Sequence, residues 1–113
     1  MEHRITVDGI ETYGRLTGWS EITSIALVRE PAVVHDGIVV AQSYVLVLVE
    51  LVTGDFFEIP QDGPGWNRVL DGLPKHRELR VAGLDDVIAA GEPGETLLWQ
   101  QTAVGEEVRG GGG

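Results

Sequence analysis

The sequence contains no cysteine, which excludes disulfide bonds and thiolate metal sites and gives no sign of an oxidising compartment. It also lacks a long apolar run. The run over 44–49 is far shorter than the ~20 residues that a membrane-spanning helix needs, and Glu50 follows it. Residues 1–6 do not form the apolar core of a signal peptide. We therefore expect a cytoplasmic protein without a membrane partner.

Basic residues are scarce. Eight lysines and arginines stand against eighteen acidic residues, which gives a net charge of −10. A field of this sign repels nucleic acid and anionic membranes, and it favours basic proteins or cations as partners. The same charge also keeps a protein soluble without any specific partner. Composition therefore indicates the sign of a partner's charge and leaves open whether a partner exists.

The residue patterns of common catalytic and cofactor sites are missing too. No glycine-rich segment follows the phosphate-binding patterns, and the eighteen acidic residues single out no catalytic pair. No serine lies in a G-x-S-x-G motif, and the histidines show no zinc-ligand spacing; these residues are Ser20, Ser24 and Ser43, and His3, His35 and His76. We expect no catalytic residue, no cofactor and no metal, and hence a protein that is not an enzyme.

What the sequence does contain is strand and turn signals. The β-branched run over 38–52 is bounded by Asp36-Gly37 and by Thr53-Gly54-Asp55, which predicts a long strand between two tight turns. Gln42-Ser43 predicts a bulge or bend within that strand. The remaining predicted strands are 3–7 and 10–16, joined by a turn at Asp8-Gly9, then 22–29, 32–34, 56–59 and 96–104.

Two segments change to a helical period. Trp66, Val69, Leu70 and Leu73 recur at i, i+3, i+4 and i+7, which predicts a short amphipathic helix over 64–73. Asp62-Gly63-Pro64 is expected to cap its start, and Leu73-Pro74 is expected to end it. A second helix is predicted by Leu84, Val87 and Ile88, with Asp85 and Asp86 favourable at its amino end.

Tryptophans and one basic cluster complete the pattern. Trp19, Trp66 and Trp99 are expected to be core residues, although any exposed one would be a binding anchor. The basic cluster is expected to balance the carboxyl end of the first helix, with anion binding as the alternative; it consists of Lys75, His76, Arg77 and Arg80. Length and composition predict one β-rich domain over 1–105 and a disordered glycine-rich tail over 106–113.

Two motifs together suggest a relationship. Trp19-Ser20-Glu21-Ile22 enters a strand, and Phe57-Glu58-Ile59-Pro60 is followed by Pro64-Gly65-Trp66 at the start of a helix. This pattern resembles that of small uncharacterised bacterial proteins, over roughly residues 17–75. The order of a meander and then a helix is similar to the bacterial pleckstrin-homology-like (PH-like) architecture, which implies no catalytic residue. The expected fold is α+β, mainly β: an antiparallel meander of about five to seven strands, forming a curved sheet or half-barrel capped by the helix.

We expect a non-enzymatic acidic protein-interaction module of the inhibitor or immunity type, which binds a basic protein. Acids on the central strands and turns are the expected contact residues: Glu50, Asp55, Glu58, Asp62 and Asp71. Two alternatives stay open. One is a PH-like domain that binds a small molecule at the mouth of the sheet. The other is a structural protein that associates with itself through an exposed strand edge, as a homo-oligomer.

Overall fold

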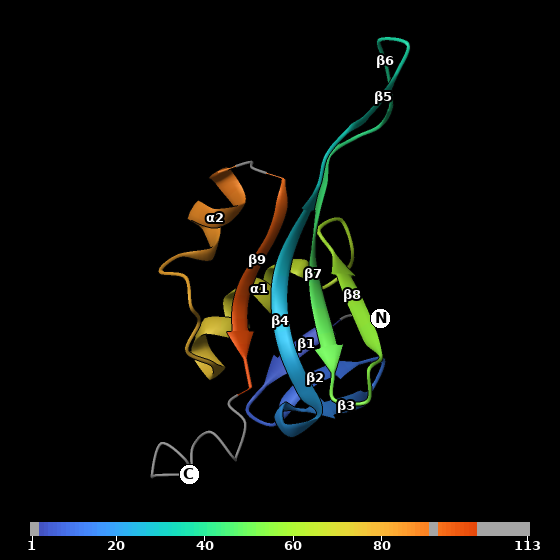
Figure 1. The fold of residues 1–113 in the computed structure, drawn as a ribbon. Coiled ribbons are helices and arrows are strands. Elements are labelled where there is room, and N and C mark those ends of the chain that lie inside the picture. Colours follow the sequence, from blue (N-terminus) through green and yellow to red (C-terminus); the bar gives the residue numbers. More distant parts are fainter. Residues whose placement is uncertain (1–2, 91–92, 102–113) are drawn as a thin grey trace, which may run out of the picture.

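Nine antiparallel strands in three sheets and two short helices form the described part of the chain (Figure 1). The computed structural model describes residues 3–90 and 93–101. The strands are β1 (His3–Thr6), β2 (Gly9–Thr12), β3 (Arg15–Gly18), β4 (Ile22–Glu30), β5 (Val33–His35), β6 (Ile38–Ala41), β7 (Tyr44–Leu51), β8 (Phe56–Pro60) and β9 (Gly94–Gln100). The helices are α1 (Trp66–His76) and α2 (Leu84–Ala90), and a short 3-10 helix, Trp19–Glu21, precedes β4. None of the helices in residues 3–90 and 93–101 is long and apolar enough to span a membrane.

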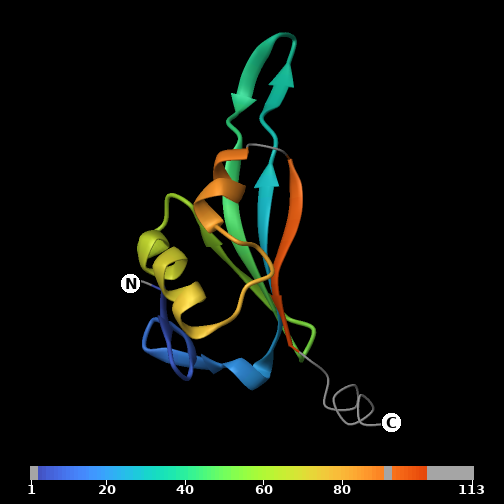
Figure 2. The same cartoon turned by 90° about the vertical axis from the view of Figure 1, so that its left-hand side faces the viewer.

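The sheets have a simple order. The three-stranded sheet runs β1-β2-β3, the four-stranded sheet runs β8-β7-β4-β9, and β5 and β6 form a hairpin by themselves. Both helices and the three-stranded sheet lie on one side of the four-stranded sheet (Figure 2). The core fills the space between them; it includes Ile5 and Ile10, Ile25 and Leu27, Val45, Val47 and Val49, Ile59, and Val69 and Leu73. We call the opposite side of the four-stranded sheet the outer face.

The expected mainly β, α+β fold with antiparallel strands is confirmed, but the single meander is not. Nine strands replace the five to seven expected, and the sheets of the described residues do not close into a barrel. The two extra strands arise because the predicted strands 10–16 and 38–52 each divide in two. The meander is interrupted because β9 returns after both helices and pairs with β4. A strand that is distant in sequence therefore completes the four-stranded sheet, and local turn signals do not encode such a pairing.

The first hairpin differs from its prediction in two places. The turn consists of Val7 and Asp8, whereas Gly9 already pairs within β2. A Cβ on Gly9 would lie 2.0 Å from the carbonyl oxygen of Thr17, so this glycine permits the close approach of β3. The predicted strand 10–16 is broken by a second turn at Tyr13-Gly14, where both φ angles are positive, 53° and 79°. Such a turn matches the twist of a tight hairpin and produces β3 as a separate strand.

The predicted long strand 38–52 divides at Gln42-Ser43 into β6 and β7, at the expected position of a bend. Its two halves belong to different sheets and do not form one curved strand. Pairing between β4 and β7 ends at Glu30 and Tyr44, directly before Pro31. Because proline lacks an N–H group, it cannot continue the ladder, and the two strands separate there.

The predicted strands 22–29, 32–34 and 56–59 correspond to β4, β5 and β8 within one residue at each end. The last predicted strand, 96–104, corresponds to β9 up to Gln100. Residues 102–104 of that prediction and the glycine-rich tail 106–113 lie outside the described residues.

Helix α1 begins and ends later than predicted. Its N-cap is Gly65, without a side-chain capping bond, so Asp62 does not cap it. The helix continues through Pro74 to His76, because proline removes only the bond to the carbonyl of Leu70. The N–H of Arg77 donates to the Leu73 carbonyl at 2.8 Å and closes the last turn. The second predicted helix is α2.

The tryptophans pack in or against the core, as expected. Trp19 and Trp66 are 9% and 8% exposed, and Trp99 is half-buried against the core. The rings of Trp19 and Trp99 meet edge to face at 5.9 Å between centroids. The guanidinium of Arg77 lies over the Trp19 ring at 4.2 Å, so this member of the basic cluster covers aromatic surface.

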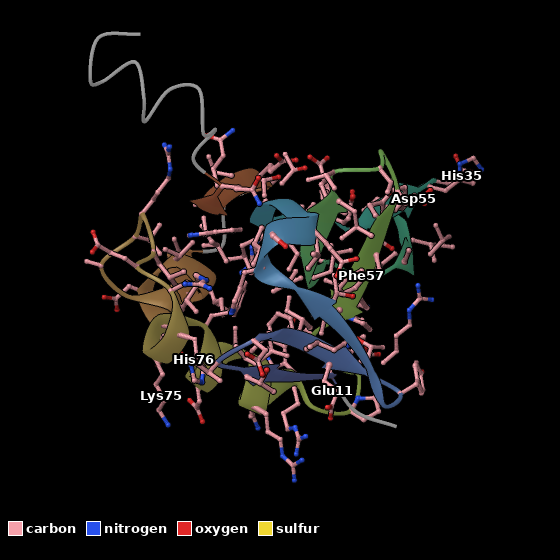
Figure 3. All side chains as sticks on the ribbon, turned by 90° about the horizontal axis from the view of Figure 1, so that it is seen from below. Glu11, His35, Asp55, Phe57, Lys75 and His76 are labelled. Atoms are coloured by element: carbon pink, nitrogen blue, oxygen red, sulfur yellow. The ribbon has the colours of Figure 1, made fainter. Side chains whose placement is uncertain are left out.

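The other members of the basic cluster lie at the periphery. Lys75 and His76 occupy the last turn of α1, where a positive charge suits the helix dipole. Figure 3 shows them at the edge of the molecule, on the opposite side from Asp55. The backbone N–H of Arg80 donates to the Leu98 carbonyl at 2.8 Å. This bond occupies part of the edge of β9 that faces away from β4. These contacts support the structural interpretation of the cluster.

Candidate functional site

The outer face of the four-stranded sheet brings together an apolar centre and an acidic border. Side chains of successive strand residues point to opposite sides, and Ile25, Leu27, Val45, Val47 and Val49 point into the core. Their sequence neighbours therefore form the outer face. The strand register arranges them in rows: Glu30 with Tyr44; Glu95, Val28, Leu46 and Pro60; Leu97, Ala26, Leu48 and Glu58; and Gln100, Ser24, Glu50 and Phe56.

The centre of this face is closely packed. Ala26 and Leu46 retain 3% and 4% exposure, and Val28, Leu48 and Leu97 are half-buried. Although Ala26 and Leu46 are buried, none of these five residues belongs to the core cluster on the other side of the sheet, so they form a second, thinner apolar layer. No helix or strand of residues 3–90 and 93–101 covers it, and Figure 2 shows this side of the sheet open. Apolar surface of this kind, bordered by polar residues, is typical of protein-interaction sites.

Acidic residues surround the apolar centre. Glu30, Glu50, Glu58 and Glu95 are all exposed on this face, and its rows contain neither lysine nor arginine. The hydroxyl of Ser24 donates to a carboxylate oxygen of Glu50 at 3.2 Å. The face thus presents four negative charges around a layer without charge.

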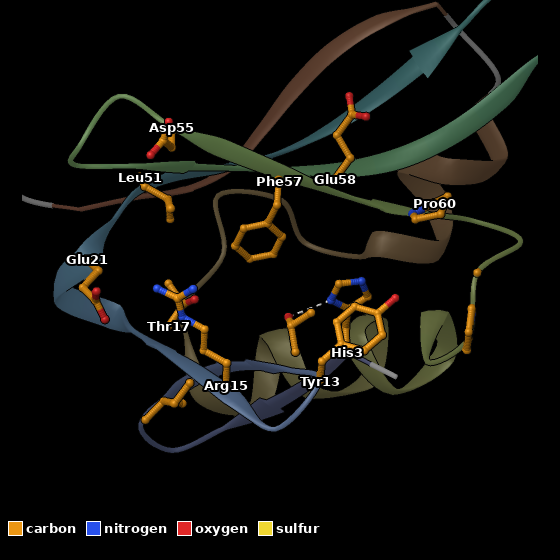
Figure 4. Close-up of a pocket in the computed structure, with 14 residues that line it drawn as sticks. His3, Tyr13, Arg15, Thr17, Glu21, Leu51, Asp55, Phe57, Glu58 and Pro60 are labelled. Carbon is orange, nitrogen blue, oxygen red and sulfur yellow. Dashed lines mark hydrogen bonds between the residues drawn. The ribbon is translucent and has the colours of Figure 1, made fainter. Parts of the chain in front are cut away.

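A trough of about 810 Å³ opens beside this face, between β8 and the three-stranded sheet (Figure 4). Phe57 points into it from β8, and His3 and Tyr13 lie opposite. The rings of His3 and Phe57 are parallel, with centroids 6.1 Å apart. Partial burial lowers the pKa of His3, whose Nδ1 lies 2.9 Å from the Thr12 hydroxyl. Glu58 points away from the trough, which agrees with its position on the outer face.

Of the acids expected to contact a partner, the structure brings two together on the outer face. Glu50 and Glu58 lie in neighbouring rows. Asp55 lies in the turn between β7 and β8 and lines the trough. Asp62 belongs to the loop after β8, and Asp71 belongs to α1 on the other side of the sheet.

Sequence reasoning missed Glu30 and Glu95. Alternate residues of a strand point to the same side of the sheet, and Glu30 follows Ala26 and Val28 in this series along β4. Its position on the outer face could therefore be inferred once it was known which residues of β4 point into the core. Glu95 joins the face through the pairing of β9 with β4, for which the sequence has no local signal.

The described residues offer no grouping of three or more His, Cys, Asp or Glu side chains that could hold a metal ion. The three histidines are separate: His3 lies in β1, His35 in the β5–β6 hairpin and His76 at the end of α1.

Comparison of the chain with protein-family models, curated protein sequences and solved structures finds no match.

Proposed function

We propose that this chain is a non-enzymatic acidic module that binds a basic protein through the outer face of its four-stranded sheet. The observation that carries the proposal is the arrangement of Glu30, Glu50, Glu58 and Glu95 around an uncharged apolar centre that the described elements leave open. Such a pattern matches the general structure of protein interfaces, in which an apolar centre is bordered by polar residues.

The two parts of the face have different roles. The glutamates attract a basic partner and accelerate its association, because charge complementarity acts over about 10 Å at moderate ionic strength. The apolar centre, with Leu48 and Leu97, then loses contact with water in the complex and slows dissociation. An inhibitor or immunity-type protein that blocks a basic enzyme in the cytoplasm would need this combination of rapid and lasting association.

The architectural part of the proposal is the PH-like arrangement. It is supported by the three-stranded and four-stranded antiparallel sheets and by α1, which packs against β1. The resemblance to small bacterial proteins with the Trp19 and Trp66 motifs belongs to the same proposal.

The experiment compares two variants of equal net charge. The face variant carries Glu50→Gln, Glu58→Gln and Glu95→Gln. The control variant carries Asp62→Asn, Asp71→Asn and Glu78→Gln, which are exposed outside the outer face. Each set removes three negative charges from the chain's −10. Immobilised wild type and both variants are exposed to a lysate of the native host at low salt, and the retained proteins are quantified by mass spectrometry.

The proposal predicts one or a few basic proteins that the wild type and the control variant retain and the face variant loses. An exposed ion pair contributes about 0.2–1 kcal/mol, so three neutralised glutamates should weaken binding by on the order of tenfold. Raising the salt concentration should release the same proteins from the wild type. Equal retention by both variants, or retained proteins that are acidic, would show that the outer face is not the binding site.

A second candidate function, binding of a small molecule, is favoured by the trough beneath Phe57. Its volume of about 810 Å³ and its three rings, from His3, Tyr13 and Phe57, suit a small aromatic compound. A fragment library screened by NMR should then shift resonances of these three residues first, and Phe57→Ala should abolish the shifts. Fragments that shift only residues elsewhere would remove this candidate.

A further inference from the structure

The β5–β6 hairpin is the least covered part of the described chain. It projects beyond the four-stranded sheet, away from both helices (Figures 1 and 2). All seven residues of its two strands are exposed. The exposed fractions of its large apolar residues are 53% for Val33, 58% for Val34, 66% for Ile38, 48% for Val39 and 60% for Val40. An isolated two-stranded hairpin is at best marginally stable in water, so apolar residues of this kind need a partner surface.

Both faces of the hairpin are apolar. Val34 pairs with Val39 on one face, while the pairs Val33 with Ala41 and His35 with Ile38 occupy the other. In the described residues, neither β5 nor β6 pairs with any further strand, so both outer edges keep unpaired N–H and C=O groups. An occupant must therefore provide apolar side chains and backbone partners at the same time.

These requirements exclude a lipid bilayer as the occupant. Hydrocarbon offers no partner for the open edges of a sheet, and each unpaired backbone group would be costly there. The tip of the hairpin also carries His35 and Asp36, whose side chains are exposed and 3.4 Å apart. A protein strand, in contrast, would pair with either edge.

The distribution of charge favours a second copy of this chain as the partner of the hairpin. The chain carries −10, so most contacts between two copies bring like charges together. The segment over 31–49 is the exception, because Asp36 is its single aspartate or glutamate and it contains neither lysine nor arginine. Two copies therefore meet here with the least repulsion. A basic partner, attracted by acids elsewhere, gains nothing from this segment by charge.

We propose that two copies of the chain associate through their β5–β6 hairpins. A two-fold axis allows the same edge of each hairpin to pair with that of the other, so that their apolar side chains lie side by side in one sheet and the contact closes in a dimer. Two hairpins together form a four-stranded unit, which exceeds the number of strands needed for independent stability. The outer face stays free for a basic partner, because it lies on the body of the protein below the hairpin.

Sedimentation equilibrium of the full chain measures the mass directly, and Val39→Asp tests the hairpin. The matched control is Leu16→Asp, which adds the same charge at another exposed apolar residue, 46% exposed in β3. We expect a dimer for the wild type and for Leu16→Asp, and a monomer for Val39→Asp. Because the hairpin is outside the core, circular dichroism should show Val39→Asp folded. A monomeric wild type, or a dimer that persists in Val39→Asp, overturns the proposal.

The absence of cysteine permits a second measurement. A single Val40→Cys substitution introduces one thiol on the hairpin, and Asn67→Cys introduces one on the exposed side of α1. Mild oxidation should link the Val40→Cys chain into a covalent dimer at least tenfold faster than the Asn67→Cys chain. Equal rates would mean that the hairpins do not meet, whatever the mass in solution.

Discussion

Gly72 determines how closely α1 packs against the three-stranded sheet. A Cβ added at this position would lie 2.7 Å from Cβ of Ile5, and 3.1 Å and 3.5 Å from its Cγ1 and Cγ2. Real Cβ atoms do not approach this closely, and Cβ of Ile5 is fixed to the backbone of β1. Gly72→Ala therefore requires a shift of the helix or of the strand.

Two opposing effects decide the sign of this substitution. Alanine is a better helix former than glycine by about 1 kcal/mol, which would stabilise an open helix. Overpacking in a tight core costs about 1–3 kcal/mol, and Ile5 is only 8% exposed. We expect a net destabilisation of about 1 kcal/mol, which lowers Tm by about 4 °C for a chain of this length.

Urea unfolding followed by tryptophan fluorescence measures this change, with Asn67→Ala as the control. Asn67 is exposed on the same helix, so its replacement changes helix propensity without adding atoms to the core. The control should be neutral or stabilise slightly. If Gly72→Ala instead stabilises the protein by about 1 kcal/mol, which is the gain expected where a helix has free space for the added methyl group, α1 does not pack on β1 as described.

Three further substitutions or conditions test the fold. Gly9→Ala should destabilise the protein by about 3 kcal/mol or more in urea unfolding, because its Cβ would collide with backbone atoms of Thr17; a smaller loss would contradict the close approach of β3. Trp19→Phe removes the indole N–H that donates to the Val7 carbonyl at 2.9 Å, and should cost about 1 kcal/mol or more; an unchanged urea midpoint would contradict this bond. Partial burial lowers the folded-state pKa of His3 below its ordinary value of 6.5, so the unfolded chain takes up the proton first as the pH falls. The stability contribution of His3 should thus be complete above pH 6.5 and decline below it, and His3→Gln should reduce this slope between pH 7.5 and pH 5.

Local signals in the sequence identified most elements of this fold. The hairpin at Asp36-Gly37, the strand that begins at Ile22 and the helix that begins at Trp66 follow from turn residues and from periodicity. Tyr13-Gly14 was missed because tyrosine rarely occupies a position with positive φ, so the alternation around it resembled one strand. Boundaries set by local residues were therefore readable where the turn residues were typical.

The sheet order was readable from local signals only in part. Pro31 cannot donate to a ladder and marks the place where the β4–β7 pairing stops, but the return of β9 to β4 after two helices has no local signal. The same long-range pairing completes the outer face, since Glu95 reaches it only through β9. Glu50 and Glu58 were within reach of sequence reasoning because both lie on strands of one hairpin, β7–β8.

The affinity of a captured basic partner at two ionic strengths tests the central claim most directly. Isothermal titration at about 50 mM and about 300 mM salt would compare the wild type, the face variant at Glu50, Glu58 and Glu95, and the control variant of equal charge. We predict that the wild type and the control variant lose affinity steeply with salt, whereas the face variant binds weakly at both concentrations. A face variant with the affinity and salt dependence of the control variant would contradict the assignment of the outer face as the binding site.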